Sequence, residues 1–376
     1  MTDAGRITET TGPGHVVVVR TRNTSAHGHE AVTLDTMARR IATLMGSVYA
    51  GDYAPAAHYD GPLYFVPDET LLDADAARLG IRTQDDLFGG VVPYPFVATK
   101  SVSHPALERT SRVPEGWSHA LAERLADAVL PGFSVFTAAD ARHACERILK
   151  TGAARMKPAL GIGGTGQTVA NCLADFDAAL QQIDEAELRK YGLAIEQNLD
   201  DVVTYSVGQA ELAGIRISYY GMQRLTRNHR DQDVYGGSDL HVVRGDFDAL
   251  LARELPADIR HALEQARRYD ECVREAFPGF FASRRNYDVV RGRDRDGREV
   301  SGVLEQSWRI GGASPAEIAA VEALLADPAL HAVQASTHEI YALQSPPPGA
   351  AVHFSGDDER VGHITKYSVV GDGNQA

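Results

Sequence analysis

Hydrophobic positions along the chain recur with two different periods, which predict a mixture of helices and strands. Four apolar residues at helical spacing predict a helix over residues 34–46, and Thr137 with Asp140 resembles the capping pair of another helix. Further helices are expected over 256–277 and 315–325. Strands are expected where short runs are β-rich or alternate between apolar and polar residues, at 15–20, 63–66, 153–156, 193–199, 205–211, 216–225, 286–290 and 300–310.

The order of these elements divides the chain into five parts. Residues 1–14 are polar and glycine-bearing and are expected to be disordered. Residues 15–95 form a small α/β unit, 96–195 a second α/β unit, and 196–345 a unit whose strands suit a largely antiparallel sheet. A proline-rich break then leads into a C-terminal tail, 346–376, which is expected to be a short polar segment.

Composition and charge narrow the class of protein without naming it. With 376 residues, of which 44% are hydrophobic, the chain can bury a substantial core. The net charge of -14, from 51 acids against 37 bases, argues against nucleic acid or an anionic membrane as a partner, because both favour a basic face.

Cysteine usage and the N-terminal segment indicate the cytoplasm. Cys145, Cys172 and Cys272 lack paired or metal-binding spacing and are expected to be reduced thiols that fill core space. The chain begins with neither the basic start nor the apolar length of a signal peptide, and no run approaches a membrane span.

A pair of acids on two neighbouring strands is the main chemical feature. Asp288 lies in the run 286–290 and Glu305 in 302–312, and the charged segment between them, with Asp296-Gly297, is typical of a hairpin turn. Antiparallel pairing would bring the two carboxylates together as oxygen ligands for Mg²⁺, which usually keeps substrate phosphates in its shell. The alternative is a pair of solvated acids without function.

A lysine followed by a glycine-rich loop lies upstream. Lys157 ends a short strand that continues into the loop 161–166, where backbone N–H groups could approach phosphates. The glycines fit G-x-G-x-x-G, but the acid expected about twenty residues later would fall in the helix-like stretch 180–188, so a dinucleotide fingerprint is rejected. A Walker loop is rejected because no Gly-Lys-Ser/Thr triplet closes the run.

These segments, in this order, resemble the ATP-grasp superfamily of ligases. The resemblance covers about residues 96–320 and implies an α/β (α+β) ATP-grasp fold preceded by a small α/β (pre-ATP-grasp) domain at 15–95, with the lid subdomain at 96–195 and the core with its metal site at 196–345. It further extends to a bacterial family of that superfamily without an established substrate. The residues to which the resemblance assigns ATP contacts are Lys100, Lys157, Gly161, Gly163, Gly164, Gly166, Glu196, Gln197, Leu199 and Thr204, and the metal signature is Asp288, Glu305 and Ser307, followed by Arg309.

Two residues depart from the superfamily pattern. Ser307 stands where relatives have a metal-binding asparagine, and Thr204 stands roughly where many have a ribose-binding glutamate. A hydroxyl or a water could hold a second magnesium ion in place of the asparagine, and the number of ions is left open.

The resemblance implies an ADP-forming ligase that uses ATP and Mg²⁺ in the cytoplasm. A substrate carboxylate would be activated as an acyl phosphate, with Lys157 and Arg309 as catalytic groups, and an amine or other nucleophile would displace the phosphate. The substrates would be small molecules, and the protein could be a homodimer. The alternatives are a non-catalytic ATP-binding sensor or regulatory module with a degenerate site, and an α/β protein whose motifs are coincidental.

Candidate groups for the substrate carboxylate or the γ-phosphate lie between the run 193–199 and the hairpin of Asp288 and Glu305. Arginines suit such anions because the guanidinium forms paired hydrogen bonds with them. A solvated basic loop is the competing interpretation. Three candidates, Arg227, Ser238 and Arg244, lie in a segment around 223–244 that is interpreted as turn-rich. The other two, Arg284 and Arg285, come just before the strand of Asp288. His104 and His241 have no partner evident in the sequence and are interpreted as structural, and Trp308 as a packing residue.

Overall fold

The structure of the protein is a computed structural model that describes residues 14–22, 25, 27–161 and 166–371. The N-terminal segment that is expected to be disordered lies, except for Gly14, outside these residues. Among the described residues, no helix is both long and apolar enough to cross a membrane.

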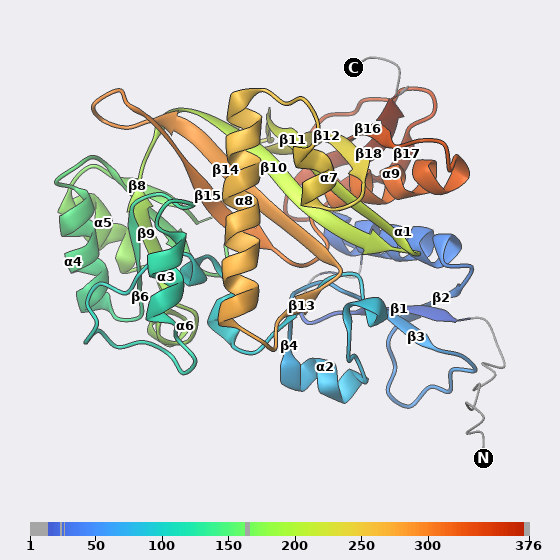
Figure 1. Ribbon diagram of the computed structural model, residues 1–376, viewed down its shortest axis with the longest axis horizontal. Coiled ribbons are helices and arrows are strands. Elements are labelled where there is room, and N and C mark those ends of the chain that lie inside the picture. Colours follow the sequence, from blue (N-terminus) through green and yellow to red (C-terminus); the bar gives the residue numbers. More distant parts are fainter. Residues whose placement is uncertain (1–13, 23–24, 26, 162–165, 372–376) are drawn as a thin grey trace.

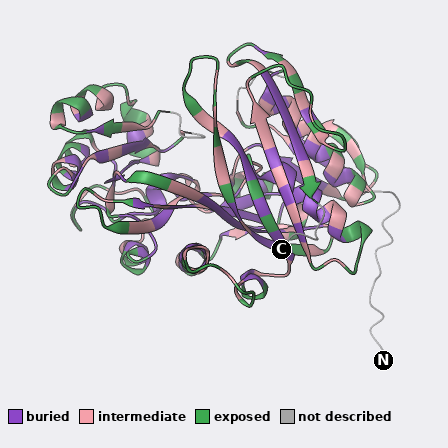
Figure 2. Ribbon diagram, turned by 90° about the horizontal axis from the view of Figure 1, so that it is seen from above, coloured by how far each residue is buried: buried purple, intermediate pink, exposed green. Residues whose placement is uncertain are grey.

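An eight-stranded antiparallel sheet forms the centre of the molecule (Figure 1). Its strands in sheet order are β15 (Glu299–Ser307), β14 (Arg284–Arg293), β10 (Asp200–Leu212), β11 (Ile215–Arg227), β12 (Asp233–Arg244), β16 (Ala332–Ile340), β18 (Gly362–Gly371) and β17 (Ala351–Asp358). Consecutive residues of the inner strand β10 are buried, so both faces of the sheet are covered there, and Figure 2 shows buried residues along the strands of this sheet.

Helices cover the two faces of this sheet. One face packs against α8 (Ala257–Ala276), with α7 (Phe247–Leu251) and α3 (His119–Leu125) beside it, around buried Tyr205, Val207, Tyr287 and Val289. The other face packs against α9 (Ser314–Ala326) and α1 (His29–Leu44), around residues such as Ala210 and Leu212. Neighbouring residues of one strand therefore contribute to opposite layers.

A separate four-stranded antiparallel sheet lies at one end of the central sheet (Figure 1). Its order is β6 (Gly132–Val135), β9 (Leu193–Gln197), β7 (Ala154–Pro158) and β8 (Thr168–Ala170), and α4 (Ala138–Ile148), α5 (Leu173–Leu180) and α6 (Glu185–Tyr191) accompany it. The Thr137 hydroxyl accepts a hydrogen bond from the Asp140 amide at 3.1 Å, which confirms the predicted start of α4.

The first unit contains a parallel sheet and a smaller mixed one. The parallel sheet has the order β2 (Val48–Asp52), β1 (His15–Val19), β3 (Leu63–Pro67) and packs against α1. The mixed sheet has the order β13 (Phe281–Ala282), β5 (Gly90–Val92), β4 (Leu71–Leu72), next to α2 (Asp73–Leu79). Because β13 directly precedes β14, this sheet joins the first unit to the central sheet. A short 3-10 helix, η1 (Gln84–Asp86), precedes β5, and two more, η2 (Pro95–Ala98) and η3 (Lys100–Val102), follow it.

The predicted helices at 256–277 and 315–325 and the largely antiparallel core sheet are confirmed. Two helix boundaries are wrong. The first helix begins at His29, because the Asp358 carboxylate of distant β17 accepts the His29 amide at 2.9 Å. The helix-like stretch 180–188 is broken, because the Asp184 carboxylate caps a new helix, α6, through the Glu187 amide at 2.8 Å.

Two segments interpreted as turns or tail are strands. The stretch around 223–244 belongs to the long hairpin β11–β12, in which Gln223 lies opposite Ser238 and Arg227 opposite Asp233. The tail after the proline-rich break forms the hairpin β17–β18 and joins the central sheet through β16, so it is not merely a short polar segment. The expectation for the thiols is wrong at Cys172, which is exposed, while Cys145 and Cys272 are buried.

Candidate functional site

The predicted acidic hairpin exists with the predicted register. Asp288 of β14 lies directly opposite Glu305 of β15, and a bulge at Leu304 separates this pair from the regular ladder below it. Burial and the neighbouring Glu305 carboxylate raise the pKa of Asp288 to about 6, which the hydrogen bond from Asn286 opposes. Two carboxylates held this close favour a bound cation.

The raised pKa predicts that replacing Asp288 stabilises the protein in the absence of metal. An aspartate in an unfolded chain has a pKa of about 3.9, so a higher folded-state pKa means that ionised Asp288 disfavours folding above pH about 6. We expect Asp288→Asn to increase the free energy of unfolding by about 1 kcal/mol at pH 7.5 in EDTA, and the gain to vanish below pH about 4, where both states are protonated.

Thermal unfolding at both pH values measures this effect. Asp296→Asn, in the exposed hairpin turn where the Asp296 carboxylate pairs with Arg298 at 3.0 Å, is the matched control and should leave the melting temperature nearly unchanged. A loss of stability in Asp288→Asn at pH 7.5 would contradict the strained carboxylate pair.

Lys100 reaches the same pair of acids from another part of the chain. It lies on η3, it is 7% exposed, and its Nζ is 2.7 Å from Glu305 Oε2. The ammonium also donates to the backbone oxygen of Gly161, at the start of the glycine-rich loop. The structure thereby joins the lysine predicted to contact ATP, the acidic hairpin and the start of the loop.

Gln306 fixes the segment that carries Lys100, and sequence reasoning missed it. Its side-chain amide donates to the carbonyl oxygens of Val97 at 3.1 Å and Thr99 at 2.7 Å, and its oxygen accepts the Tyr269 hydroxyl at 3.2 Å. The signal in the sequence is its place beside Glu305: adjacent strand residues point to opposite faces, so a polar residue next to a site acid faces the core and needs buried partners.

The ammonium group of Lys157 lies near the same hairpin, and the side chain is almost fully buried. Its Nζ lies 3.0 Å from Glu196 Oε1 and donates to the carbonyl oxygen of Leu304, the bulge residue, at 2.7 Å. His104, which had no partner evident in the sequence, lies with Nε2 3.2 Å from the other oxygen of Glu196. Burial alone would raise the pKa of Glu196, but Lys157 and His104 together lower it below its usual range.

Further residues expected to contact ATP lie on or after β9, which pairs with the strand of Lys157. Glu196, Gln197 and Leu199 are all less than 8% exposed at the end of β9, and Thr204 lies on the following strand opposite Val290. The Glu196 carboxylate is engaged by Lys157 and His104. Of the loop glycines, Gly161 and Gly166 are the last and first described residues on the two sides of the loop. Gly163 and Gly164 lie outside the described residues.

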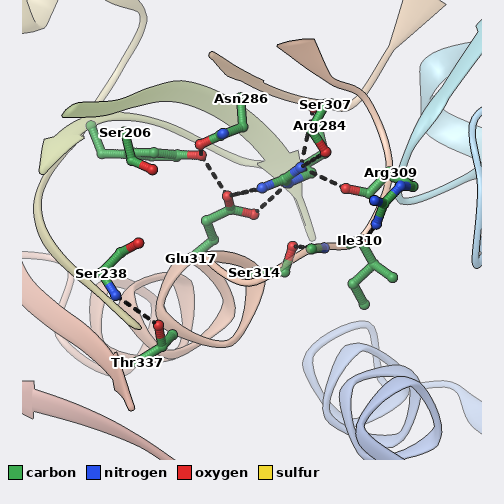
Figure 3. Close-up of polar contacts among 12 residues, drawn as sticks. Ser206, Ser238, Arg284, Asn286, Ser307, Arg309, Ile310, Ser314, Glu317 and Thr337 are labelled. Carbon is green, nitrogen blue, oxygen red and sulfur yellow. Dashed lines mark hydrogen bonds and ion pairs between the residues drawn. The ribbon is translucent and has the colours of Figure 1, made fainter. Parts of the chain in front are cut away.

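A buried polar network around Arg284 and Glu317 contacts the end of β15 (Figure 3). Arg284 and Glu317, each 1% exposed, form a two-point ion pair with distances of 2.9 Å and 2.7 Å. The remaining Arg284 nitrogen donates to the Ser307 hydroxyl at 3.1 Å and to the Arg309 carbonyl oxygen at 2.5 Å. Burial on its own would lower the pKa of Arg284, but Glu317 more than offsets this and raises it. Arg284 therefore remains charged and holds the end of the metal signature.

Arg309 points to the first unit of the chain. Its Nε is 3.2 Å from Glu69 Oε2, and Glu69 Oε1 is 3.0 Å from Arg22 Nε. Burial lowers the pKa of Arg309 more than Glu69 raises it. The guanidinium thus lies where the first unit meets the metal hairpin.

Of the other substrate candidates, the arginines are not brought together with this site, whereas Ser238 lies opposite Gln223, whose side chain hydrogen bonds to Asp288. Arg227 pairs with Asp231 at 2.7 Å, and Arg244 donates to the Leu324 carbonyl oxygen at 2.8 Å. Ser238 is buried and hydrogen bonds with the Tyr235 hydroxyl at 2.7 Å. Arg285, one residue after Arg284, points to the opposite face of the sheet.

Two remaining sequence interpretations concern packing. Trp308 is 1% exposed and packs against Phe280 with ring centroids 4.4 Å apart, as expected of a packing residue. His241 stacks on Tyr220 at 4.9 Å, which agrees with a structural role.

An open cavity beside α4 lies away from these residues. It has a volume of about 720 Å³, and Leu107, His143 and Leu173 are among its lining residues. None of the predicted site residues lines it. Among the described residues, no group of three or more His, Cys, Asp or Glu side chains could hold a metal ion, so the Asp288–Glu305 pair would need other oxygen ligands.

The architecture is the ATP-grasp fold that the sequence resemblance implies. The biotin carboxylase domain of 2-oxoglutarate carboxylase from Hydrogenobacter thermophilus, a dimer in complex with MgADP, ADP and bicarbonate, is 13% identical and matches with a TM-score of 0.53 over 95% of this chain and 86% of that chain. The chain belongs to the family described as "Protein of unknown function (DUF3182)", whose model matches residues 17–368.

Two other solved structures match over most of their length. D-alanyl-alanine synthetase A from Vibrio cholerae is 12% identical, with a TM-score of 0.46 over 81% of this chain and 92% of that chain. Phosphoribosylamine–glycine ligase from Thermotoga maritima is 13% identical, with a TM-score of 0.46 over 95% and 92%. No curated protein matches the chain.

Proposed function

We propose that the protein is an ATP-dependent ligase that activates a small-molecule carboxylate as an acyl phosphate and transfers the acyl group to an amine or other nucleophile. The observation that supports this most is convergence on one hairpin. Lys100 contacts Glu305 at 2.7 Å and Lys157 contacts the bulge carbonyl of Leu304 at 2.7 Å, although the lysines come from different elements. Such an array of cations next to paired carboxylates suits a bound triphosphate with its metal.

The residues present fit a magnesium ion and ATP. Glu305 Oε2 is buried and, within the described part of the chain, has Lys100 as its ionic partner but no hydrogen bond of good geometry. Asp288 and Glu305 would hold Mg²⁺, which when bound neutralises charge on the phosphates. Lys100, Lys157 and the loop amides would orient the transferred group, and Arg309 would stabilise the acyl phosphate.

Asn286 offers a replacement for the asparagine that relatives have at the position of Ser307. The two residues lie directly opposite each other on β14 and β15, on the face that carries Asp288. The single Tyr219 hydroxyl proton is shared between Glu317 Oε1 at 2.5 Å and Asn286 Oδ1 at 2.9 Å, and the charged carboxylate is the stronger acceptor. Asn286 Oδ1 therefore keeps capacity as a metal ligand, and the departure at Ser307 does not remove the amide oxygen from the site.

The proposed domains follow the superfamily arrangement, with 15–95 as the pre-ATP-grasp domain, 96–195 as the lid and 196–345 as the core. The lid sheet extends to Gln197, because β9 crosses the boundary expected at 195. We further propose a cytoplasmic location, on the grounds of the reduced cysteines and of the use of ATP, and a homodimer, on the grounds of the superfamily. The second candidate, a non-catalytic ATP sensor, is favoured by Thr204 and by the engagement of the Glu196 carboxylate.

Phosphate release from ATP tests the ligase proposal. We expect magnesium-dependent release that is stimulated by particular members of a panel of amino acids and small carboxylic acids. Lys157→Met should lower the rate by about a hundredfold, because it removes one preorganised charge from the phosphate site. Lys150→Met, an exposed lysine at the end of α4, is the control and should retain the rate.

Two results would count against a ligase. ATP binding without stimulation by any acid would favour the sensor. Stimulated release that survives Lys157→Met unchanged would separate the activity from this site.

A further inference from the structure

A second polar cavity lies behind the central sheet, on the face opposite the acidic hairpin. It has a volume of about 330 Å³, and among the residues that line it, Phe247 alone is hydrophobic. Side chains from β10, β14 and α8 meet there. A cavity of this size can hold a molecule as large as an amino acid, and its polar lining favours a charged one.

Arg285 is a buried cation in this cavity with little compensation. It is 8% exposed, and its Nη1 lies 3.5 Å from Asp270 Oδ2, at the limit of a hydrogen bond. Its Nε is buried and has no acceptor within the described residues. Its neighbour Arg284 has a two-point ion pair with Glu317. An unpaired buried guanidinium edge is costly unless an anion completes it.

Gln209 adds a second polar group directly beside Arg285. The two residues are opposite each other in the β10–β14 pair and both line the cavity. Gln209 is 6% exposed, and the structure shows no side-chain hydrogen bond for it in the described part of the chain. An amide next to the free edge of a guanidinium can bind the two oxygens of a carboxylate.

The acids of the lining are already engaged. Asp270 accepts the Tyr287 hydroxyl at 2.7 Å and pairs with Arg274 at 3.1 Å. Asp248 and Glu271 both pair with Arg267, at 2.5 Å and 2.9 Å. The carboxylate of Glu211 is shared by Gln84 and Arg216, and that of Asp246 accepts the amides of Asp248 and Ala249. These acids therefore leave the inner edge of Arg285 free for a ligand.

The overall charge of the lining decides what kind of anion fits. Five acids and four arginines line the cavity, so a ligand with several negative charges, such as a nucleoside triphosphate or inorganic phosphate, would be repelled. A zwitterion adds no net charge to this lining. Its carboxylate would lie on Arg285 and Gln209, and its ammonium toward the surrounding carboxylates, whose remaining lone pairs can accept further hydrogen bonds.

We propose that this cavity is a binding site for a free amino acid, separate from the ATP site. Arg285 and Gln209 bind the carboxylate, and the acids of α7 and α8 face the ammonium group. Because Arg285 is three residues from Asp288 on the same strand, the ligand sits on the reverse side of the strand that bears the metal ligands. The site does not depend on the ligase function.

Isothermal titration of the full chain without ATP or magnesium tests this proposal. The panel contains the common amino acids, the matching amines without a carboxylate, the matching acids without an amine, and inorganic phosphate. We expect at least one amino acid to bind with a Kd below about 1 mM, and its amine and acid analogues to bind about tenfold more weakly or worse.

Four variants locate the binding. Arg285→Gln and Gln209→Leu should each weaken it by about tenfold or more, since each removes groups that bind the carboxylate. Arg293→Gln, an exposed arginine on the same strand, and Glu305→Gln in the metal pair should leave it unchanged. Circular dichroism checks that each variant is folded. If Arg285→Gln does not fold, the binding measured with Gln209→Leu tests the site.

Three results would overturn the proposal. The first is no amino acid binding at about 10 mM, a concentration that would reveal even weak sites. The second is binding that Glu305→Gln removes and Arg285→Gln or Gln209→Leu leaves intact, which would place the ligand at the hairpin. The third is binding of phosphate in preference to amino acids.

Discussion

Glu305→Gln is expected to reduce acid-stimulated ATP turnover by about a hundredfold or more, because it removes one of two carboxylates held for the metal. The change is isosteric, so β15 should keep its register with β14. It also removes the ionic partner of Lys100, which lies 2.7 Å away. Steady-state phosphate release at saturating ATP and magnesium measures the effect.

Glu299→Gln is the matched control for this variant. Glu299 begins the same strand but is exposed, and its carboxylate lies 3.6 Å from Arg291. Its turnover should stay within about twofold of the wild type, because an exposed ion pair contributes little to stability. Equal turnover in Glu305→Gln and the wild type would contradict the proposal that Glu305 binds the metal ion.

Glu317→Gln is expected to destabilise the protein by about 3–5 kcal/mol, because it leaves the charge of Arg284 buried without its counter-ion. Both residues are 1% exposed, and two short contacts join them. Urea unfolding, with tryptophan fluorescence as the signal, measures the change in the free energy of unfolding.

Glu322→Gln on the same helix provides the comparison. Glu322 pairs with Arg40 at 2.5 Å, but its side chain is 37% exposed, so its loss should cost about 1 kcal/mol or less. Similar losses in the two variants would show that the Arg284–Glu317 pair contributes no more than a surface ion pair.

The acidic pair could be predicted from the sequence because its geometry is local. Asp288 and Glu305 are joined by a short turn, and the register of a hairpin follows from its turn and its alternation. Lys157 at the end of a strand was likewise readable from the residues beside it. The superfamily resemblance then supplied the relation between these segments, which neither segment contains by itself.

The parts that the sequence did not predict depend on distant contacts. Asp358 determines where α1 begins, and it lies 329 positions away from His29. Glu317 was not singled out because its partner Arg284 lies on another element. The direction of Arg285 follows from strand alternation, but its incomplete pairing, with only Asp270 at 3.5 Å, is visible only once α8 and β10 are in place around it.

The hairpin β11–β12 shows a second limit of local patterns. Its residues 223–244 contain many charged and glycine residues, which are typical of turns, yet they continue as strands because cross-strand partners such as Arg224 and Asp239, 2.5 Å apart, satisfy them. Glycine also has a packing role there, since a Cβ on Gly237 would meet the Thr337 carbonyl oxygen of the next strand at 1.9 Å. Composition alone therefore does not separate such strands from loops.

Calorimetric titration of the wild-type protein with ATP, with and without magnesium, tests the central claim most directly. The account predicts one ATP per chain with a Kd in the micromolar range, about -8 kcal/mol, that weakens by tenfold or more when magnesium is removed or when Glu305→Gln is used. Absence of ATP binding, or binding that is indifferent to both magnesium and Glu305, would contradict a magnesium–ATP site at the Asp288–Glu305 hairpin.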